Sequence, residues 1–178
     1  MIVINLYKRL EFWILLKIWL IRFQKLWKNS IVKYGLFWNP ERIIIEEYVY
    51  IWENCNFWGL GWITIASGTI CWPNIIIRSS NHNYKSWDYL PYGPWVESRP
   101  VKVWKNCWIW DSVLIAPWTQ IWEWVIIWMW SVVSWEIPAY SIEVWNPWKV
   151  IKTRDIDIYN TLKEEDKIYI KNKILWNI

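Results

Sequence analysis

Branched aliphatic residues recur every six positions along the middle of this chain. They are Val103, Ile109, Ile115, Ile121, Ile127 and Val133. Four residues after each stands a residue that is mostly small or β-branched: Cys107, Val113, Thr119, Val125, Ser131 and Ile137. A period of six matches neither the 3.6-residue turn of a helix nor the two-residue alternation of an ordinary strand.

A six-residue period predicts a β-solenoid, in which each hexapeptide makes one short strand and one corner. Three hexapeptides close a triangular coil, and stacked coils pair like parallel strands about 4.8 Å apart. The same period occurs earlier, with a slip of two residues midway, at Ile45, Ile51, Phe57, Ile65, Cys71 and Ile77. The predicted fold class is therefore all-β, a parallel β-helix with aliphatic columns inside. An Ile-rich helical or sandwich protein is the alternative, and six consecutive positions in phase disfavour it.

Tryptophan is the second unusual feature, because the chain holds 22 Trp and only 5 Gly. An ordinary soluble domain is far richer in glycine than in tryptophan. Four Trp directly follow a column aliphatic, namely Trp104, Trp110, Trp122 and Trp128. We expect the corner of the coil at this place, where a tight or positive-φ backbone favours glycine. Rings one coil apart would then stack along the outside of the prism.

Two interpretations of these Trp residues remain open. Reading Gly at most of them turns residues 103–133 into a regular hexapeptide-repeat sequence. Some bacterial lineages read UGA as glycine, whereas a common alternative table reads it as tryptophan, so we hypothesise that many Trp stand for glycine codons. Trp108 is the best candidate for a genuine tryptophan. The other interpretation is a true aromatic ladder that binds sugars or bases.

Length and composition narrow the function classes. The length suits one domain with a short appendage. A net charge of +4 is too mild to indicate nucleic acid as a partner. Cys55, Cys71 and Cys107 form no CxxC pair, which favours buried thiols in a reducing compartment over a disulfide framework or a zinc site.

The N-terminal segment, residues 1–30, is expected to contain a helix over residues 6–28. Three basic residues interrupt its apolar stretch, whereas a membrane span requires about 20 nearly uncharged residues. We expect this helix to pack on the domain, and peripheral contact with a membrane surface is the alternative. Residues 31–154 are assigned to the β-helix. Residues 155–178 are a charged tail that forms a short helix or remains loose.

His82 is the only histidine. It lies in an interruption, residues 78–100, where the six-residue phase stops. Long excursions from a regular scaffold are commonly functional, which favours a catalytic role over that of an ordinary surface or core histidine. Asp88 and Glu97 lie in the same excursion. Either could orient an imidazole or bind a hydroxyl group, and their spacing does not choose between these roles.

Three segments resemble the hexapeptide-repeat acyltransferases, a family with a left-handed parallel β-helix. They are WPNIIIRSSNHNY (72–84), RPVKVWKNCWIWDSVLIAPWTQIWEWVIIWMWSVV (99–133) and EIPAYSIEVWNPWKVIK (136–152). The likeness is greatest to the sugar O-acetyltransferase and antibiotic acetyltransferase branch, and it covers about residues 45–154. Trp at most of the family's Gly positions is the main departure.

The resemblance implies an acetyl-CoA-dependent O-acetyltransferase acting on a sugar hydroxyl of a cell-surface polysaccharide or lipopolysaccharide precursor. His82 would be its general base, because imidazole titrates near neutral pH. No metal is required. The family's coenzyme A contacts map onto Asp111, Met129, Ser134, Lys149 and Lys152, with Arg154 near the phosphate end. A homotrimer in the cytoplasm, or at the inner face of the membrane, is also implied.

Other functions stay open at this point. A γ-class carbonic anhydrase shares the fold but needs several His ligands, so a single His excludes it. Residues 1–44 are too short for the extra domain of a nucleotidyltransferase. A non-catalytic β-solenoid scaffold and an antibiotic acetyltransferase are the remaining alternatives. A membrane-active Trp-rich protein would not keep a strict six-residue period.

Overall fold

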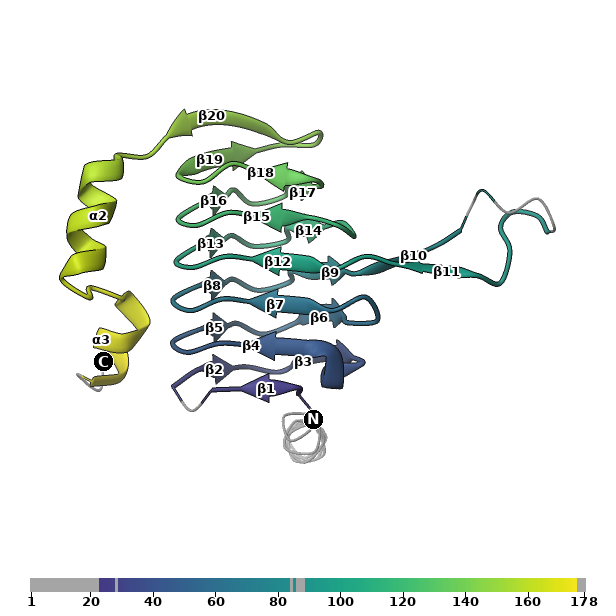
Figure 1. The fold of residues 1–178 in the computed structure, drawn as a ribbon, viewed down its shortest axis with the longest axis horizontal. Helices are drawn as coiled ribbons and strands as arrows, with labels where there is room; N and C mark the ends of the chain where they lie inside the picture. Colours follow the sequence, from purple (N-terminus) through teal and green to yellow (C-terminus); the bar gives the residue numbers. More distant parts are fainter. Residues whose placement is uncertain (1–22, 28, 84, 86–88, 176–178) are drawn as a thin grey trace, which may run out of the picture.

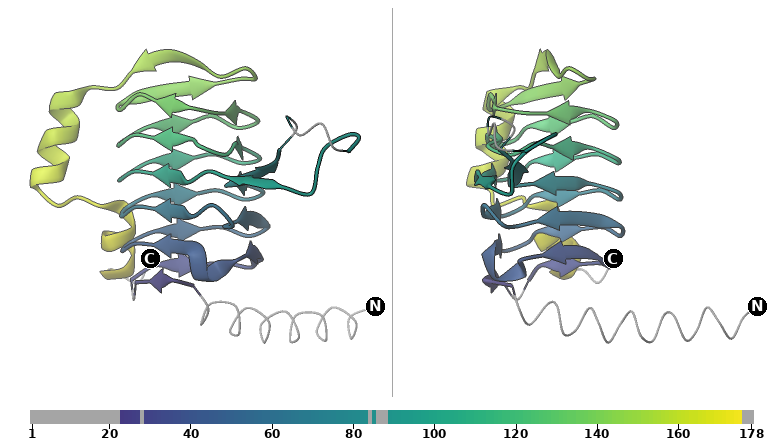
Figure 2. Two further views of the ribbon diagram at one scale, coloured as in Figure 1. Left: turned by 45° about the vertical axis from the view of Figure 1, so that its right-hand side comes forward. Right: turned by 90° about the vertical axis from the view of Figure 1, so that its right-hand side faces the viewer.

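The computed structural model describes residues 23–27, 29–83, 85 and 89–175. Short strands wind into a stack of coils, a hairpin arm projects from one edge of the stack, and two helices run along another edge (Figures 1 and 2). The parallel β-solenoid that the six-residue period predicts is confirmed. The stacked strands exclude the alternative of a helical or sandwich protein.

Three sheets form the sides of the prism, and their strands pair in parallel except at the last one. Sheet A contains β1 (Lys25–Leu26), β4 (Ile43–Ile45), β7 (Ile63–Ile65), β12 (Val101–Val103), β15 (Gln120–Ile121) and β18 (Glu136–Ile137). Sheet B contains β2 (Ile31–Val32), β5 (Tyr50–Ile51), β8 (Ile70–Cys71), β13 (Trp108–Ile109), β16 (Ile126–Ile127), β19 (Ser141–Val144) and the antiparallel β20 (Lys149–Thr153). Sheet C contains β3 (Gly35–Trp38), β6 (Cys55–Trp58), β9 (Ile76–Arg78), β14 (Leu114–Ile115) and β17 (Val132–Val133). A 3-10 turn, η1 (Pro40–Arg42), precedes β4.

Coil length changes along the stack. Ile43 pairs with Ile63, so an early coil contains 20 residues. Lys102 pairs with Gln120, so a later coil contains 18 residues, which is three hexapeptides. The slip of two residues after Phe57 therefore marks the longer early coils.

The six-residue columns form the core. All twelve column residues between 103 and 137 are at most 1 % exposed, and so are the six earlier ones between 45 and 77. The three cysteines are free thiols within this core, and burial raises the pKa of each. This confirms the expected buried thiols.

The corners differ from our expectation in one respect. After five of the six column aliphatics the third following residue has positive φ, namely Asn106, Ser112, Trp118, Trp124 and Trp130. After Val133 it is the second residue, Trp135, and none of the four Trp that directly follow an aliphatic has positive φ. The residue after the aliphatic still continues the strand, as the 2.9 Å hydrogen bond from Trp110 N to Ile127 O shows, and the chain turns two residues later. The expected place of the positive-φ corner is therefore wrong.

Six Trp have positive φ: Trp62, Trp118, Trp124, Trp130, Trp135 and Trp145. A bulky L-residue is strained in this region, whereas glycine is not. The backbone at these positions thus supports the glycine interpretation of these codons, which stays a prediction. The expected ring stacking is also present, because the Trp104 and Trp122 centroids are 4.8 Å apart and those of Trp110 and Trp128 are 4.5 Å apart.

The N-terminal segment differs in part from the predicted helix. Residues 6–22 of the expected N-terminal helix lie outside the described residues. The helix does not extend to residue 28, because β1 pairs with β4 and Phe23 is buried in the core. Residues 23–27 therefore belong to the solenoid, whose first strand begins at Lys25 and not after residue 30 as predicted.

The C-terminal tail forms two helices, α2 (Ile156–Glu164) and α3 (Tyr169–Leu175), which run back along the coils (Figure 1). The Asp155 side chain caps α2 by accepting hydrogen bonds from the backbone N–H groups of Asp157 and Ile158. Tyr159 and Ile170 are buried against the solenoid. No helix within the described part of the chain is long and apolar enough to cross a membrane.

Candidate functional site

The arm interrupts the solenoid between β9 and β12. Its strands β10 (Ser80–His82) and β11 (Val96–Ser98) pair in antiparallel fashion, with His82 opposite Val96. Two backbone hydrogen bonds frame this hairpin: Arg99 N donates to Ser79 O at its base, and Asn83 N donates to Trp95 O farther out. The arm therefore leaves the coil from a fixed position (Figure 1).

The base of the arm is packed closely. Ser79 is fully buried, and its hydroxyl donates to Trp58 O at 2.6 Å and accepts a hydrogen bond from Gly61 N at 2.9 Å. A Cβ on Gly61 would collide with the carbonyl oxygen of Ser79, so only glycine permits this approach. This packing fixes the root of the arm that carries His82.

His82 lies on β10 with an exposed side chain. Its imidazole stacks on Tyr92 from the far part of the arm, with ring centroids 4.1 Å apart and planes at 29°. This contact orients the imidazole plane. An exposed and oriented imidazole is suited to proton transfer with a bound hydroxyl group.

A cavity of about 550 Å³ lies between the base of the arm and the outer face of sheet C. Its lining is Trp38, Asn39, Trp58, Leu60, Ile76, Arg78, Ser80, Asn81, His82, Val96, Leu114, Ile115, Ala116, Pro117 and Val132. Most of this surface is apolar, with amide, hydroxyl, imidazole and guanidinium groups at one side. This composition is typical of small-molecule sites, where a few polar groups fix the orientation of a ligand.

The residues predicted to contact coenzyme A do not line this cavity. Asp111 and Met129 lie at the corner between sheets B and C, one coil apart, since Trp130 N donates to Asp111 O at 3.2 Å. The Asp111 carboxylate accepts hydrogen bonds from the Asn74 amide and the Ser112 hydroxyl. Ser134 directly follows β17 and is half-buried.

The predicted cations near the phosphate end fall into two groups. Lys149 and Lys152 lie on β20 with exposed side chains. Arg154 instead faces the solenoid, where it donates to Trp124 O at 3.0 Å and its guanidinium lies 3.6 Å from the Trp124 ring centroid. Burial lowers the pKa of Arg154. The two lysines are thus available to a ligand, whereas Arg154 serves the packing of the tail.

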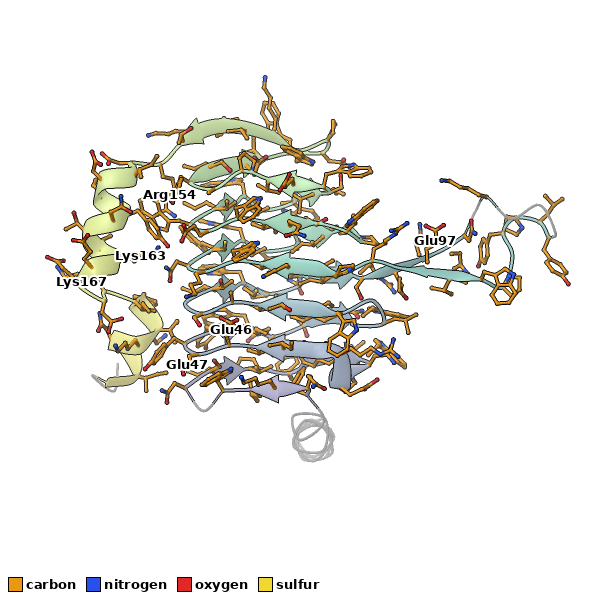
Figure 3. All side chains as sticks on the ribbon, in the orientation of Figure 1. Glu46, Glu47, Glu97, Arg154, Lys163 and Lys167 are labelled. Atoms are coloured by element: carbon orange, nitrogen blue, oxygen red, sulfur yellow. The ribbon has the colours of Figure 1, made fainter. Side chains whose placement is uncertain are left out.

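Of the two carboxylates that the sequence places in the excursion, the structure describes only Glu97. Glu97 projects from the arm and forms a 3.8 Å ion pair with Arg99 (Figure 3). Neither of these residues lines the cavity. Asp88 lies outside the described residues. Among the described residues, no group of three His, Cys, Asp or Glu side chains could hold a metal ion.

Sequence reasoning missed Arg78, which lines the cavity with His82. Its position was a signal, because Arg78 is the last residue of β9 before the repeat breaks.

Sequence reasoning also missed a polar cluster under α2. There, Glu123 accepts hydrogen bonds from the hydroxyl groups of Tyr140 at 3.0 Å and Tyr159 at 2.8 Å, and pairs with Lys163 at 3.4 Å (Figure 3).

Comparison with known proteins supports the assignment of the fold. The chain is 22% identical over 131 residues to the "Putative colanic acid biosynthesis acetyltransferase WcaF" of Escherichia coli, covering 73% of this chain and 69% of that protein. It is 30% identical over 129 residues to the "Putative acetyltransferase SAV2555" of Staphylococcus aureus, covering 72% of this chain and 62% of that protein. No family model matches the chain.

Solved structures give the same result. A maltose O-acetyltransferase from Clostridium difficile superposes with a TM-score of 0.68 at 26% identity, over 78% of this chain and 74% of that one. In sequence and in fold the chain is thus similar to the hexapeptide-repeat acetyltransferases. A hexapeptide-repeat acetyltransferase from Vibrio cholerae, solved with acetyl coenzyme A, superposes with a TM-score of 0.71 at 20% identity, over 77% of this chain and 74% of that one.

The stacked coils and these similarities confirm the predicted left-handed parallel β-helix and the prediction of an enzyme. The relatives and the two solved structures are named as acetyltransferases, and one of those structures holds acetyl coenzyme A.

Proposed function

We propose that this acetyltransferase transfers the acetyl group to a sugar hydroxyl, with His82 as general base. The observation that carries the proposal is the position of His82, an exposed, ring-stacked imidazole that lines a cavity of about 550 Å³. Related proteins named for maltose and galactoside acetylation, and for colanic acid biosynthesis, favour a sugar acceptor. A cell-surface polysaccharide or lipopolysaccharide precursor is the acceptor class we favour.

The transfer requires no covalent enzyme intermediate. The His82 imidazole takes the proton from the acceptor hydroxyl while its oxygen attacks the thioester carbonyl of acetyl-CoA. Backbone N–H groups of a neighbouring coil stabilise the oxyanion of the tetrahedral intermediate. The C–S bond then breaks, and the imidazolium returns the proton to the departing thiolate.

For the donor, we propose that Asp111, Met129 and Ser134 contact coenzyme A and that Lys149 and Lys152 bind its phosphate end. The lysines are exposed on β20, so a phosphate can reach them. Their replacement by alanine is expected to raise the KM for acetyl-CoA several-fold and to leave kcat unchanged. An unchanged KM at low salt would remove the lysines from the donor site.

We also propose a homotrimer, because the arm projects beyond its own coils and a neighbouring chain would complete the groove beside it. The donor and the three free thiols favour the cytoplasm as the location. Peripheral membrane contact through the N-terminal segment remains part of this proposal, and residues 1–22 lie outside the described structure.

The test is release of coenzyme A thiol in the presence of acetyl-CoA and a panel of sugars. His82→Ala is expected to abolish release, whereas Lys85→Ala on the same arm is the matched control and should retain it. Thiol release that persists in His82→Ala would contradict the proposed base. Failure to bind acetyl-CoA at all would favour the non-catalytic scaffold, and selective turnover of aminoglycosides or other drugs would favour the antibiotic acetyltransferase.

A further inference from the structure

We infer that the acceptor carries a negative charge close to the sugar, a phosphate or a carboxylate, and that Arg78 binds this group. The inference rests on the proposed function, since it specifies which sugars the cavity beside His82 accepts. It starts from the order of residues along the outer face of sheet C.

Strand register aligns Arg78 above two tryptophans. Trp38 pairs with Trp58 on the neighbouring coil, and Trp58 pairs with Arg78 on the next. The two indole centroids are 5.2 Å apart, and the Arg78 guanidinium carbon lies 3.8 Å from the Trp58 ring centroid. Ile77 pairs with Ile115, so the coil above places the small Ala116 at the next position of this column.

This stacking prepares the guanidinium for an anion. A guanidinium lying flat on an aromatic ring keeps its N–H groups at its edge, where they can donate two parallel hydrogen bonds to a phosphate or carboxylate. The small Ala116 leaves space beside that edge. Trp38 and Trp58 also line the cavity and offer an apolar surface for the face of a sugar ring.

The charges around the cavity favour an anion. Among the described residues of its lining, Arg78 and His82 are the only ionisable ones, and none is Asp or Glu. No described acidic side chain forms an ion pair with Arg78. Arg99, on the returning side of the arm's base, pairs with Glu97 and lies over Trp118 at 4.4 Å. Within the part of the chain that the structure describes, Arg78 therefore has no acidic partner, and its positive charge lies beside the proposed base.

The experiment compares three acceptors built on the same hexose ring: galactose, galactose 1-phosphate and galacturonate. We expect kcat/KM of the wild-type enzyme to be about 10- to 100-fold higher for at least one anionic sugar than for galactose, as charge-assisted hydrogen bonds require. Preference for galactose 1-phosphate identifies a phosphate, and preference for galacturonate identifies a carboxylate. Arg78→Gln should remove the preference through KM for the acceptor, with KM for acetyl-CoA unchanged.

Two variants serve as controls. Arg78→Lys keeps the charge but loses the two-pronged geometry, so an intermediate preference is expected. Arg99→Gln makes the same change in net charge outside the cavity and should keep the wild-type preference. Equal turnover of neutral and anionic sugars by the wild-type enzyme would overturn the inference, and so would an Arg78→Gln effect on KM for acetyl-CoA alone.

Binding measurements separate this inference from the proposed function. Titration of galactose 1-phosphate and galacturonate into wild-type protein and Arg78→Gln, followed by calorimetry, needs no turnover. Tighter binding to the wild-type protein supports the anion site even if no sugar is acetylated, a result that would contradict the proposed function. Equal, weak binding to both proteins sinks the inference, while His82-dependent acetylation of neutral galactose would leave the proposed function standing.

Discussion

Two of the three corners of the prism treat their ionisable groups in opposite ways. At the covered corner, between sheets A and B, Glu123 bonds to Tyr159 and Lys163 of α2. Arg154 bonds there to the Trp124 carbonyl of the solenoid. At the open corner, between sheets C and A, Arg78 and His82 line a cavity and have only aromatic rings as close partners among the described contacts.

Polar groups at the covered corner stabilise the fold, whereas those at the open corner are accessible to a ligand. Burial raises the pKa of Glu123, but hydrogen bonds from Tyr159 and Tyr140 and the charge of Lys163 outweigh it, so the net pKa is lowered. Burial likewise raises the pKa of Tyr159, whose hydroxyl donates to that carboxylate and accepts from the Asn106 amide. Such a satisfied network stabilises a fold and has no bonding capacity left for a substrate.

The largest effect is expected at the open corner and on activity alone. His82→Ala should lower kcat for thiol release by about 100- to 10,000-fold, the usual contribution of a general base, and leave the melting temperature nearly unchanged because the side chain is exposed. Tyr159→Phe is the counterpart at the covered corner and should leave kcat unchanged. A loss of activity in Tyr159→Phe as large as in His82→Ala would show that the two corners do not act separately.

At the covered corner, Tyr159→Ala should reduce the free energy of unfolding by about 3–5 kcal/mol, because it removes a buried aromatic ring and leaves Glu123 short of a donor. Tyr159→Phe keeps the ring and should cost about 1.5–3 kcal/mol. Urea unfolding of both variants measures the difference. Equal costs for the two substitutions would mean that the ring contributes nothing to docking α2.

Two carboxylates give opposite pH dependence of stability. Glu143 is fully buried opposite Ile127 in the last coil, and burial raises its pKa from 4.5 to about 7, with Ser141 opposing the shift. Its folded form binds the proton more tightly than the unfolded chain, so wild-type stability relative to Glu143→Val should fall by about 3 kcal/mol as pH rises from about 4.5 to about 7.

Glu123 is the matched comparison, because its pKa is lowered rather than raised. Its contribution should be present above the ordinary carboxyl pKa and lost on further acidification. Urea unfolding of Glu143→Val and Glu123→Gln from about pH 2.5 to about pH 8 should therefore diverge from wild type in opposite directions. Glu143→Val gains on wild type as pH rises from about 4.5 to about 7, whereas Glu123→Gln gains on wild type as pH falls below the ordinary carboxyl pKa. Parallel curves would contradict the burial of Glu143.

The smallest effect compares tryptophans with positive φ at the two corners. Trp118→Gly at the open corner should stabilise the protein by about 1 kcal/mol, because it relieves left-handed strain at φ 73°. It gives up only solvent-exposed contacts with Arg99 and Trp135. Trp124→Gly relieves similar strain at φ 58° but loses the rings of Tyr159 and the Arg154 contact, so no gain is expected. Thermal unfolding distinguishes them, and stabilisation of both would mean that strain outweighs docking everywhere.

Sequence reasoning predicted the inside of the molecule better than its corners. The columns from Val103 to Ile137 were readable because side-chain periodicity reports directly which residues face inward. The predicted turn lies two residues too early because a corner depends on backbone dihedral angles, which leave no hydrophobic signal.

The gene sequence tests whether these tryptophans stand for glycine codons. UGG codons at Trp104, Trp110, Trp122 and Trp128 would exclude glycine there.

The site was predictable only in part. His82 was conspicuous as a single histidine in a break of the repeat. The ring of Tyr92, the alignment of Arg78 with Trp58 and the docking of Tyr159 on Glu123 all join residues from different coils or elements. Such contacts depend on coil length and strand register, which only the folded chain fixes.

The way the arm is inserted bears on how such enzymes acquire new acceptors. Ile63 pairs with Val101 as regularly as Ile43 pairs with Ile63, although the whole arm lies between the first two in sequence. Each coil pairs only with the coils directly above and below it, so the inserted arm does not disturb the register of the aliphatic columns. The scaffold can therefore exchange one recognition hairpin for another at the Ser79–Arg99 junction while its interior stays in register.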